Sequence, residues 1–498
     1  MSSWSSRRAF VLGMLALGLP VPAGADGISG GLGGAFGPRF EARPIRREPR
    51  RRRQHGRGVT ERLRHWNDIA IDASGLDHTP VPPGDPRVFG EQLGPGRSSR
   101  ALAIVHIAIF DAVNAVVGGY QSYTGLRPAS ADASIEAAIA LAAHDTLTAL
   151  FPSQTADLDA ELLEDLSALR DGRAKSKGVA LGRAAAAAIL ARRANDGAQH
   201  PEPRVGIDYI TSDAPGKWRQ DPISENPLAL GARWGDVTPF VLRSGDQFRV
   251  PPPPDLDSRE YAAAYNDVKA VGGDGTVTPT VRTADQTLTG IYWAYDGTPS
   301  LCAPPRLYNQ ITLHIAEQRR TGGIELARLL ALVNVALADA GIAIWESKYH
   351  YVFWRPVTGI RESDGNPRTV PDPTYSPLGA PASNFDGPNF TPPFPAYPSG
   401  HAGFGGALFQ ILRDFYGTDR IPFTFVSDEL NGETLDNDGN ARALVPRSFS
   451  SLSEAEEENG QSRIYLGIHW AFDKTQGIAQ GRRVADYVFG RAFVRRRR

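Results

Sequence analysis

A long apolar run at residues 324–350 constrains the fold of this 498-residue chain more than any other stretch. Its apolar side chains cover most faces of a helix, so the segment must be buried on nearly all sides. Burial of that kind requires other helices packed around it, which predicts the central helix of a core. The run delivers Lys348 at its end, so it brings a positive charge to the edge of that core.

Apolar residues spaced three and four apart predict further helices on both sides of this run. Strand signals are few, so the sequence predicts an all-α fold built from helical bundles, with an N-terminal helical region at 59–320 and a C-terminal one at 321–494. The other predicted helices are 61–73, 98–117, 130–150, 156–170, 177–195, 260–271, 283–295, 307–319, 402–416 and 474–494.

Individual residues and segments within this helical pattern predict how helices pack and where long loops lie. Helix 402–416 contains three glycines near its start and is expected to pack closely on a neighbour. His106 and Asp111 are interpreted as hydrogen-bonded polar groups of a helical core. Residues 201–256 are expected to wrap the surface and contribute to a channel wall, and residues 423–462 are predicted to be a long loop with an acidic patch.

The N-terminus has the pattern of an export signal. Arg7 and Arg8 precede a short apolar run, and Ala23-Gly24-Ala25 is a small-residue cleavage site, so residues 1–25 predict export by the twin-arginine route to the periplasm or outside the cell. Residues 26–58 are rich in Gly, Pro and Arg and are interpreted as a disordered basic leader. The apolar run is too short for a comfortable membrane span, and we expect no membrane-spanning segment.

Charge and cysteine content narrow the functional classes. The formal net charge is −1, and the basic runs near both ends lack interleaved aromatic residues, so nucleic-acid binding is not expected. Cys302 is the only cysteine in the sequence, which excludes a disulfide within the chain and a thiolate metal site.

Three polar clusters in the C-terminal half carry the chemistry. Lys348 and Arg355 are seven residues apart and share a face if their segment is helical. Ser399-Gly400-His401 combines a hydroxyl, a backbone N–H and an imidazole at a predicted helix start. The third cluster contains Arg463, together with His469 and Asp473, which are four residues apart and within reach of each other on a helix.

Each cluster alone has an ordinary structural explanation as a turn or a packed helix end. Together they supply three strong cations, two imidazoles, a hydroxyl and a glycine amide. This set suits a tetrahedral oxyanion of high charge, such as phosphate or vanadate.

The pattern K-x6-R-P, P-S-G-H, S-R-x5-H-x3-D resembles the signature shared by vanadium-dependent haloperoxidases and type 2 phosphatidic acid phosphatase-like acid phosphatases. The aromatic flanks at 353–356 and 392–401, with segments 293–297 and 427–432, resemble the fungal-type chloroperoxidase branch. The resemblance covers about residues 60–490 and implies an all-helical fold with two four-helix bundles. The stretch between His401 and Ser462 is long for the group and predicts an insertion.

The resemblance also implies residue roles and a vanadate cofactor. His469 would bind vanadium directly, and His401 would hydrogen-bond the apical oxygen of vanadate and act as the acid–base group. Asp473 would orient His469, and Asp296 would pair with an arginine. Trp345 and Phe394 would line a halide pocket, for which core packing is the alternative. The residues implied to hold the oxygens of vanadate are Lys348, Arg355, Ser399, Gly400 and Arg463, with Lys348 also polarising the peroxide.

The implied activity is oxidation of bromide or chloride by hydrogen peroxide to a hypohalous acid equivalent. The preferred halide, a specific organic substrate and the oligomeric state stay open. The alternative enzyme is an exported acid phosphatase with His469 as nucleophile and His401 protonating the leaving group. A non-enzymatic oxyanion-binding protein is a third reading, which the complete set of cations and histidines disfavours.

Overall fold

The computed structural model describes residues 31–43, 58–383 and 385–496, and within them the fold is all-α with two short two-stranded sheets. This confirms the predicted fold class. The predicted export signal at 1–25 lies outside the described residues. The division into regions 59–320 and 321–494 stays a prediction.

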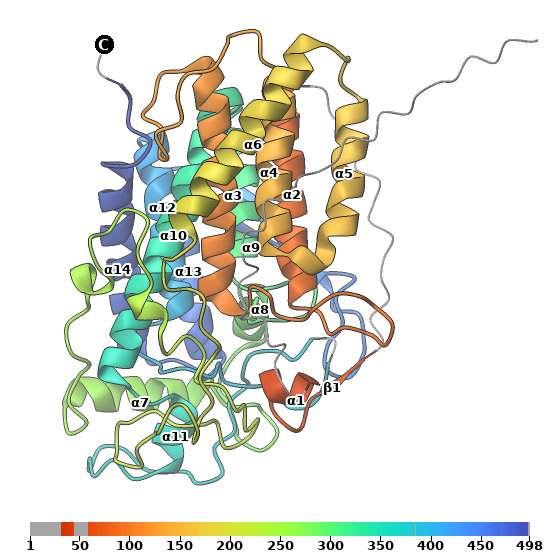
Figure 1. The fold of residues 1–498 in the computed structure, drawn as a ribbon. Coiled ribbons are helices and arrows are strands. Elements are labelled where there is room, and N and C mark those ends of the chain that lie inside the picture. The colour runs from red at the N-terminus through yellow and green to blue at the C-terminus, as the bar shows by residue number, and fades with distance from the viewer. Residues whose placement is uncertain (1–30, 44–57, 384, 497–498) are drawn as a thin grey trace, which may run out of the picture.

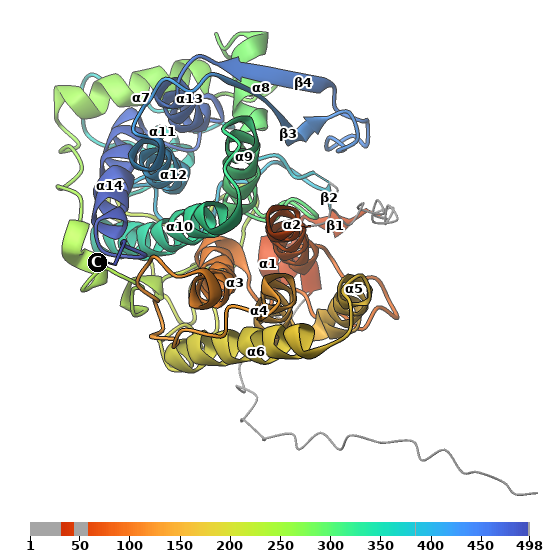
Figure 2. The ribbon, with the colours of Figure 1, turned by 90° about the horizontal axis from the view of Figure 1, so that it is seen from above.

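One group of helices comes from the N-terminal half of the chain (Figure 2). It comprises α2 (Val59–Asp77), α3 (Gly94–Val117), α4 (Ile135–Leu150), α5 (Thr155–Ser167) and α6 (Arg173–Arg193). The alanine-rich α6 lies so close to α4 that a Cβ at Gly182 would stand 2.4 Å from the Ala138 carbonyl oxygen. Glycine at this position therefore allows a backbone contact that any side chain would prevent.

A second group surrounds the long helix α10 (Gly323–Tyr351), which is the predicted central helix. It contains α9 (Pro305–Gln318), α12 (Gly400–Tyr416), α13 (Leu452–Tyr465) and α14 (Ala471–Phe489). In Figure 2, α10 lies between this group and α3. By length and composition α3 and α10 could each cross a membrane, yet 89% and 94% of their most apolar windows are buried inside the fold. Their apolar faces are therefore used in helix packing.

Glycines set the distance between α12 and α14, as the sequence predicted for α12. A Cβ at Gly481 would lie 2.0 Å from the Gly403 carbonyl oxygen, and one at Gly406 would lie 2.6 Å from the Ile478 carbonyl oxygen. A Cβ at Gly477 would lie 2.7 Å from the Ser399 carbonyl oxygen. These approaches bring the start of α12 against the start of α14, where two of the polar clusters lie.

Shorter elements and long loops gather at one end of the bundles, at the bottom of Figure 1. Among them are α1 (Gly31–Phe36), α7 (Arg259–Val271) and α11 (Pro356–Arg361), with β1 (Glu41–Ala42). The remaining short elements are α8 (Ala284–Tyr292), β2 (Phe385–Asp386) and the 3-10 turns Pro152–Gln154, Trp234–Asp236 and Gly245–Phe248.

Residues 31–43 form an ordered segment, which we call the N-terminal strap. Its β1 pairs with β2, and Phe36 and Phe40 pack with Phe385 and Phe390 in a buried aromatic cluster. Burial of a phenylalanine contributes about 1.5–3 kcal/mol. The interpretation of residues 26–58 as a disordered leader is therefore wrong for the strap, because two aromatic side chains within a Gly- and Arg-rich sequence anchor it.

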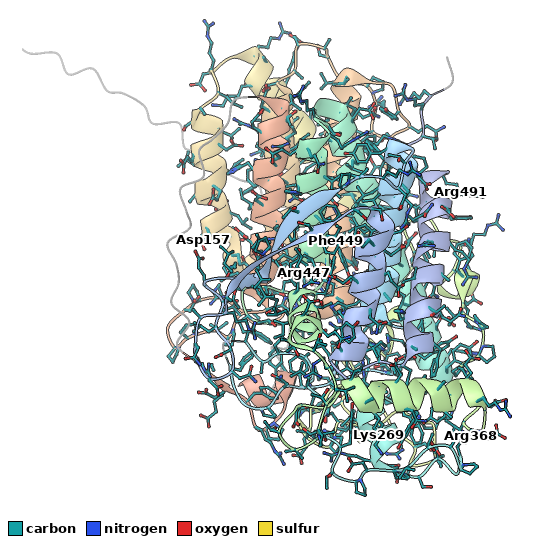
Figure 3. The ribbon with its side chains drawn as sticks, turned by 180° about the vertical axis from the view of Figure 1, so that it is seen from behind. Asp157, Lys269, Arg368, Arg447, Phe449 and Arg491 are labelled. Atoms are coloured by element: carbon teal, nitrogen blue, oxygen red, sulfur yellow. The ribbon has the colours of Figure 1, made fainter. Side chains whose placement is uncertain are left out.

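The segment 423–462 was expected to be a loop, and this prediction is wrong. It folds as a β-hairpin of β3 (Phe423–Asn431) and β4 (Leu444–Phe449), followed by α13. Figure 3 shows Arg447 and Phe449 on this hairpin; Arg447 contacts Asp285 and Glu458, and the Phe449 ring lies 5.1 Å from that of Phe423. The hairpin occupies the predicted insertion, and the Ser451 hydroxyl accepts the Glu454 N–H to start α13.

The two polar residues of α3 that the sequence analysis interpreted as core groups, His106 and Asp111, differ in their hydrogen bonding. Asp111 accepts hydrogen bonds from the Tyr123 and Thr124 N–H groups, as expected of a satisfied core carboxylate. Both ring nitrogens of buried His106 lack a hydrogen-bond partner among the described residues, so the expectation of a hydrogen-bonded His106 is wrong. Burial lowers the pKa of His106 to about 3, because nothing near it stabilises the charged imidazolium.

Replacement of His106 by Met should reduce the loss of stability on acidification. The unfolded chain binds a proton at this histidine below pH 6.5, and the native protein only below about pH 3, so the stability is present above pH 6.5 and is lost as the pH falls. Between pH 7.5 and 5.5 the wild type should lose about 1.4 kcal/mol more unfolding free energy than His106→Met. Guanidinium unfolding at both pH values measures this.

His144→Gln provides a control of opposite sign. Burial opposes protonation of His144, yet hydrogen bonds to Asp145 and Asp159 raise its pKa, so its contribution is present at low pH and is lost as the pH rises. The His144 variant should therefore be weakened more at pH 5.5 than at pH 7.5. An identical pH dependence in wild type and His106→Met would contradict the account of His106.

Candidate active site

Five helix ends bring the three polar clusters together. Lys348 lies in the last turn of α10, Ser399 precedes α12 as its N-cap, and Arg463 lies in the last turn of α13. His469 lies just before α14, and Arg355 precedes α11 as its N-cap. Residues more than a hundred positions apart in sequence therefore share one buried site.

Lys348 and Arg355 reach the site by a reversal of the chain and not along one helical face. α10 ends at Tyr351, close to the predicted end of the helix at residue 350, and Val352 follows in the left-handed region with a φ of 53°. The condition for a shared helical face, a helix that continues to Arg355, is therefore not met. The Lys348 Nζ donates to the carbonyl oxygens of Pro395 and Ala396, at 2.7 and 2.9 Å. Burial and then Arg355 lower the pKa of Lys348 well below its usual value.

The two arginines are only partly hydrogen-bonded. Arg355 donates from Nε to the Phe394 carbonyl at 2.9 Å and from Nη1 to the Ile468 carbonyl at 2.8 Å, and Arg463 donates from Nη2 to Asp296 Oδ2 at 2.6 Å. Within the part of the chain that the structure describes, buried Nη2 of Arg355 and buried Nε and Nη1 of Arg463 have no hydrogen-bond partner. Burial lowers the pKa of Arg355 to about 9.

His469 and Asp473 are in contact, as their spacing predicted, although His469 itself precedes the helix. The distance from His469 Nδ1 to Asp473 Oδ2 is 2.8 Å, and the same carboxylate oxygen accepts the Trp470 N–H at 3.0 Å. Burial, then Arg355 and Lys348, lower the pKa of His469 well below its usual value. A neutral ring that donates from Nδ1 presents the lone pair of Nε2, which lies 3.2 Å from Arg355 Nη1.

His401 is fixed from both its ring and its backbone. Its Nε2 lies 2.5 Å from the Ala294 carbonyl oxygen and 3.8 Å from Asp296 Oδ1. A carbonyl accepts only, so Nε2 carries a hydrogen and Nδ1 is the nitrogen that can exchange a proton. The Tyr308 hydroxyl and the Asn459 amide both donate to the His401 carbonyl.

The pKa of His401 lies well below the ordinary value for a histidine. Burial and then Arg463 lower it to about 3, although Asp296 opposes the shift. An oxyanion beside the imidazole would act against both causes, because negative charge favours the imidazolium. Proton exchange at His401 is therefore coupled to anion binding.

Ser399 and Gly400 lie at the start of α12, where the sequence predicted a hydroxyl and a backbone N–H beside an imidazole. The Ser399 hydroxyl accepts the Ala402 N–H at 3.5 Å, and its backbone N–H donates to the Asp473 carbonyl. A Cβ at Gly400 would meet the Trp345 ring at 3.4 Å, so the space beside this residue is narrow. A helix N-terminus without a side chain at its first position favours an anion against its N–H groups.

Trp345 and Phe394 make an aromatic rim over the cations. Their ring centroids are 4.9 Å apart, and the Phe394 centroid lies 5.1 Å from Lys348 Nζ and 4.9 Å from Arg355 Cζ. Both rings line a cavity that reaches Gly400, His401, Arg463 and His469 at its base. The rim keeps water from the cations and strengthens their electrostatic interactions.

The donor set fits an oxyanion and does not fit an ordinary divalent cation. Among the described residues, no three His, Cys, Asp or Glu side chains gather in a metal-binding group. Three buried cations face two carboxylates, Asp296 and Asp473, and burial raises the pKa of Asp473 to about 7. The unpartnered arginine N–H groups are available as donors to the oxygens of an anion, and the lone pair of His469 Nε2 is available to its central atom.

Comparisons with known proteins identify the family to which the chain belongs. Residues 328–496 match the family model described as the VCPO second helical-bundle domain. Vanadium chloroperoxidase of Curvularia inaequalis is 31% identical over 491 residues, covering 83% of this chain and 79% of that protein. The chain therefore belongs to the vanadium-dependent haloperoxidase family.

Solved structures agree on the fold. The first bacterial vanadium-dependent iodoperoxidase superposes with a TM-score of 0.69 at 23% identity, covering 89% of this chain and 99% of that one. A holo-type bacterial vanadium-dependent chloroperoxidase superposes with a TM-score of 0.61 at 17% identity, covering 84% and 95%.

Some groups at the site were not found by sequence reasoning. The carbonyl of Ala294 fixes His401, and Asn459 and Tyr308 hold its backbone. Ala294 belongs to the 293–297 segment that was singled out by resemblance, so a signal existed. Asn459 lies on the unpredicted α13, and the carbonyl groups that hold Lys348 and Arg355 carry no sequence signal.

Asp473→Ala should weaken binding of orthovanadate by about 10–100-fold, because His469 loses the group that fixes its ring and tautomer. Asp473→Asn keeps an oxygen that can accept from Nδ1 and should retain most of the affinity. Equilibrium dialysis measures binding, and thermal unfolding controls for damage to the start of α14. Wild-type affinity in the Ala variant would contradict the orienting role.

Proposed function

We propose that this vanadium-dependent haloperoxidase holds vanadate with the residues described above and oxidises a halide with hydrogen peroxide to a hypohalous acid equivalent. The observation that carries the residue assignment is the set of buried, unpartnered N–H groups on Arg355 and Arg463, together with His469, whose Nε2 lies 3.2 Å from Arg355 Nη1 and which lines the same cavity as Arg463. Buried cationic donors without partners are costly unless an anion binds them.

Each residue has a role that follows from its position. Lys348, Arg355 and Arg463 bind oxygens of the cofactor, assisted by the Ser399 hydroxyl and the Gly400 N–H. His469 binds through Nε2, while Asp473 holds the hydrogen on Nδ1. Bound vanadate supplies a d0 Lewis acid that activates hydrogen peroxide, and the oxidation state of vanadium does not change.

The overall reaction consumes one proton: halide, hydrogen peroxide and a proton give hypohalous acid and water. Nδ1 of His401 exchanges this proton, since Nε2 is engaged by the Ala294 carbonyl. Asp296 contacts both Arg463 and His401 and fixes their relative positions. Lys348 adds positive charge where negative charge develops during the reaction. The phosphatase alternative is not favoured, because the relative that shows the family is a chloroperoxidase.

Export is a separate part of the proposal. The paired arginines and the small-residue site at 23–25 support passage through a twin-arginine route. That route carries folded proteins, which suits a chain that completes its anion site by folding.

Vanadate-dependent halogenation tests the function. Protein stripped of oxyanions should brominate a generic carbon acid with hydrogen peroxide only after orthovanadate is added, and the assay repeated with chloride ranks the halides. His469→Ala should lose this turnover. Hydrolysis of phosphate esters that vanadate inhibits, without halogenation despite vanadate binding, would favour the phosphatase.

Phe394→Ala should lower kcat/KM for bromide by roughly tenfold while vanadate affinity changes little, because water would reach the halide. Phe394→Leu restores apolar bulk and should recover most of the activity. Steady-state kinetics with vanadate binding measured in parallel separates the effects. Equal losses in both quantities would instead indicate structural damage, which is the packing alternative for this ring.

A further inference from the structure

The cavity over the site has a polar base and apolar walls. It encloses about 720 Å³ of space free of protein atoms, including the mouth that opens to solvent. The base contains His401, Arg463 and His469, and the walls come from distant segments of the chain. Wall residues include Ala35, Phe36, Leu228, Leu230, Phe390 and Pro392.

The polar side chains in the walls are already hydrogen-bonded. Asn226 donates from Nδ2 to the Ala35 carbonyl at 2.8 Å and accepts the Leu228 N–H at 3.0 Å. His78 accepts the Gly94 N–H on Nε2 at 2.9 Å, and its Nδ1 lies 2.9 Å from the Ser74 carbonyl oxygen. Both ring nitrogens of His78 and both polar atoms of the Asn226 amide are thus engaged by the protein, and the predominantly apolar walls favour an apolar ligand.

The N-terminal strap contributes one of these walls. Ala35 and Phe36 line the cavity, whereas Phe40 packs in the same aromatic cluster without lining it. The Phe36 ring lies 4.7 Å from that of Phe385 and 6.3 Å from that of Phe390, another lining residue.

Several independent contacts hold the strap in place. Arg43 Nε donates to Asp386 at 2.6 Å, and Arg43 Nη1 donates to the Asp436 carbonyl at 2.7 Å. Gly37 has a φ of 114°, and a Cβ there would lie 2.0 Å from the Ser224 carbonyl oxygen. These contacts lie on the C-terminal side of Phe36, and the bond from Asn226 to the Ala35 carbonyl holds the strap on the other side.

We propose that the cavity binds an apolar, electron-rich aromatic molecule as the halogen acceptor, and that Phe36 of the strap is a specificity-determining residue for it. The inference rests on the proposed function, because the site must supply the halogen. Hypohalous acid transfers its halogen to the ring: a carbon–halogen bond forms, the oxygen–halogen bond breaks, and hydroxide takes the ring proton to give water. The oxidant is hydrogen peroxide, consumed in the preceding step.

Binding of the acceptor has a measurable consequence. A freely diffusing hypohalous acid halogenates acceptors in the ratio of their intrinsic reactivities. When transfer takes place within the cavity, the product ratio also depends on how well each acceptor binds the walls. The halogenated product of an apolar acceptor is then enriched over that of a polar one.

The experiment is a competition between 2-naphthol and uracil, with hydrogen peroxide, bromide and the full-length vanadate-loaded enzyme. The ratio of the two brominated products is compared with that given by reagent hypobromous acid. The wild-type enzyme should enrich brominated naphthol by at least about fivefold over the reagent, within the range of apolar pocket discrimination.

Three variants locate the effect. Phe36→Ala should lower the enrichment at least about threefold, through the loss of an apolar contact surface, while total bromination is unchanged. Phe36→Leu should retain most of the enrichment. Phe40→Ala, which loosens the same cluster without changing the lining, is the matched control and should keep the wild-type ratio.

The outcomes are distinguishable. A reagent-like ratio with normal total bromination would overturn this inference and leave the proposed function standing. An equal shift in Phe36→Ala and Phe40→Ala, or no shift in either, would overturn the assignment to Phe36. Failure of total bromination in the wild type would overturn the proposed function and this inference with it.

Discussion

Three consecutive backbone carbonyl groups hold two of the buried cations, and the site depends on them. The carbonyl of Phe394 accepts from Arg355, and those of Pro395 and Ala396 accept from Lys348. Carbonyl dipoles stabilise the charges without neutralising them, so the positive potential stays available to an anion. A carboxylate in the same place would have removed that potential. The cations therefore remain in a low-dielectric interior as strong anion ligands.

Close helix packing brings the remaining ligands to this loop. The contact of α12 and α14 at Gly403 and Gly481 places Ser399, the N-cap of α12, beside Asp473, and the Ser399 N–H donates to the Asp473 carbonyl. One backbone contact thus connects the hydroxyl-bearing cluster to the histidine-bearing one. Cluster geometry is a consequence of how near two helix backbones can come, which explains why small residues recur along their shared face.

Sequence was informative where the relevant geometry is local. The spacing of His469 and Asp473 predicted their contact, and the Ser399 cap and the glycines of α12 predicted a close-packed helix start. It left the relation of Lys348 and Arg355 conditional on a helix, and the left-handed residue Val352 ends that helix between them. Periodicity also missed α13, a strongly polar helix with no clear apolar stripe. The strap was missed because its two anchoring phenylalanines find their partners more than 340 residues away, a distance that no local pattern records.

The aromatic rim and the cavity walls connect the oxidation of halide to the choice of acceptor. Trp345 and Phe394 exclude water from the cations, and an apolar surface that removes water from a halide also binds the apolar face of an organic molecule. Selectivity then needs no polar recognition group, since the shape of the wall determines which ring approaches the halogen. That wall is completed by Phe36, from a segment that contributes nothing to the anion site. Acceptor preference can therefore change through the strap while the vanadate ligands stay fixed.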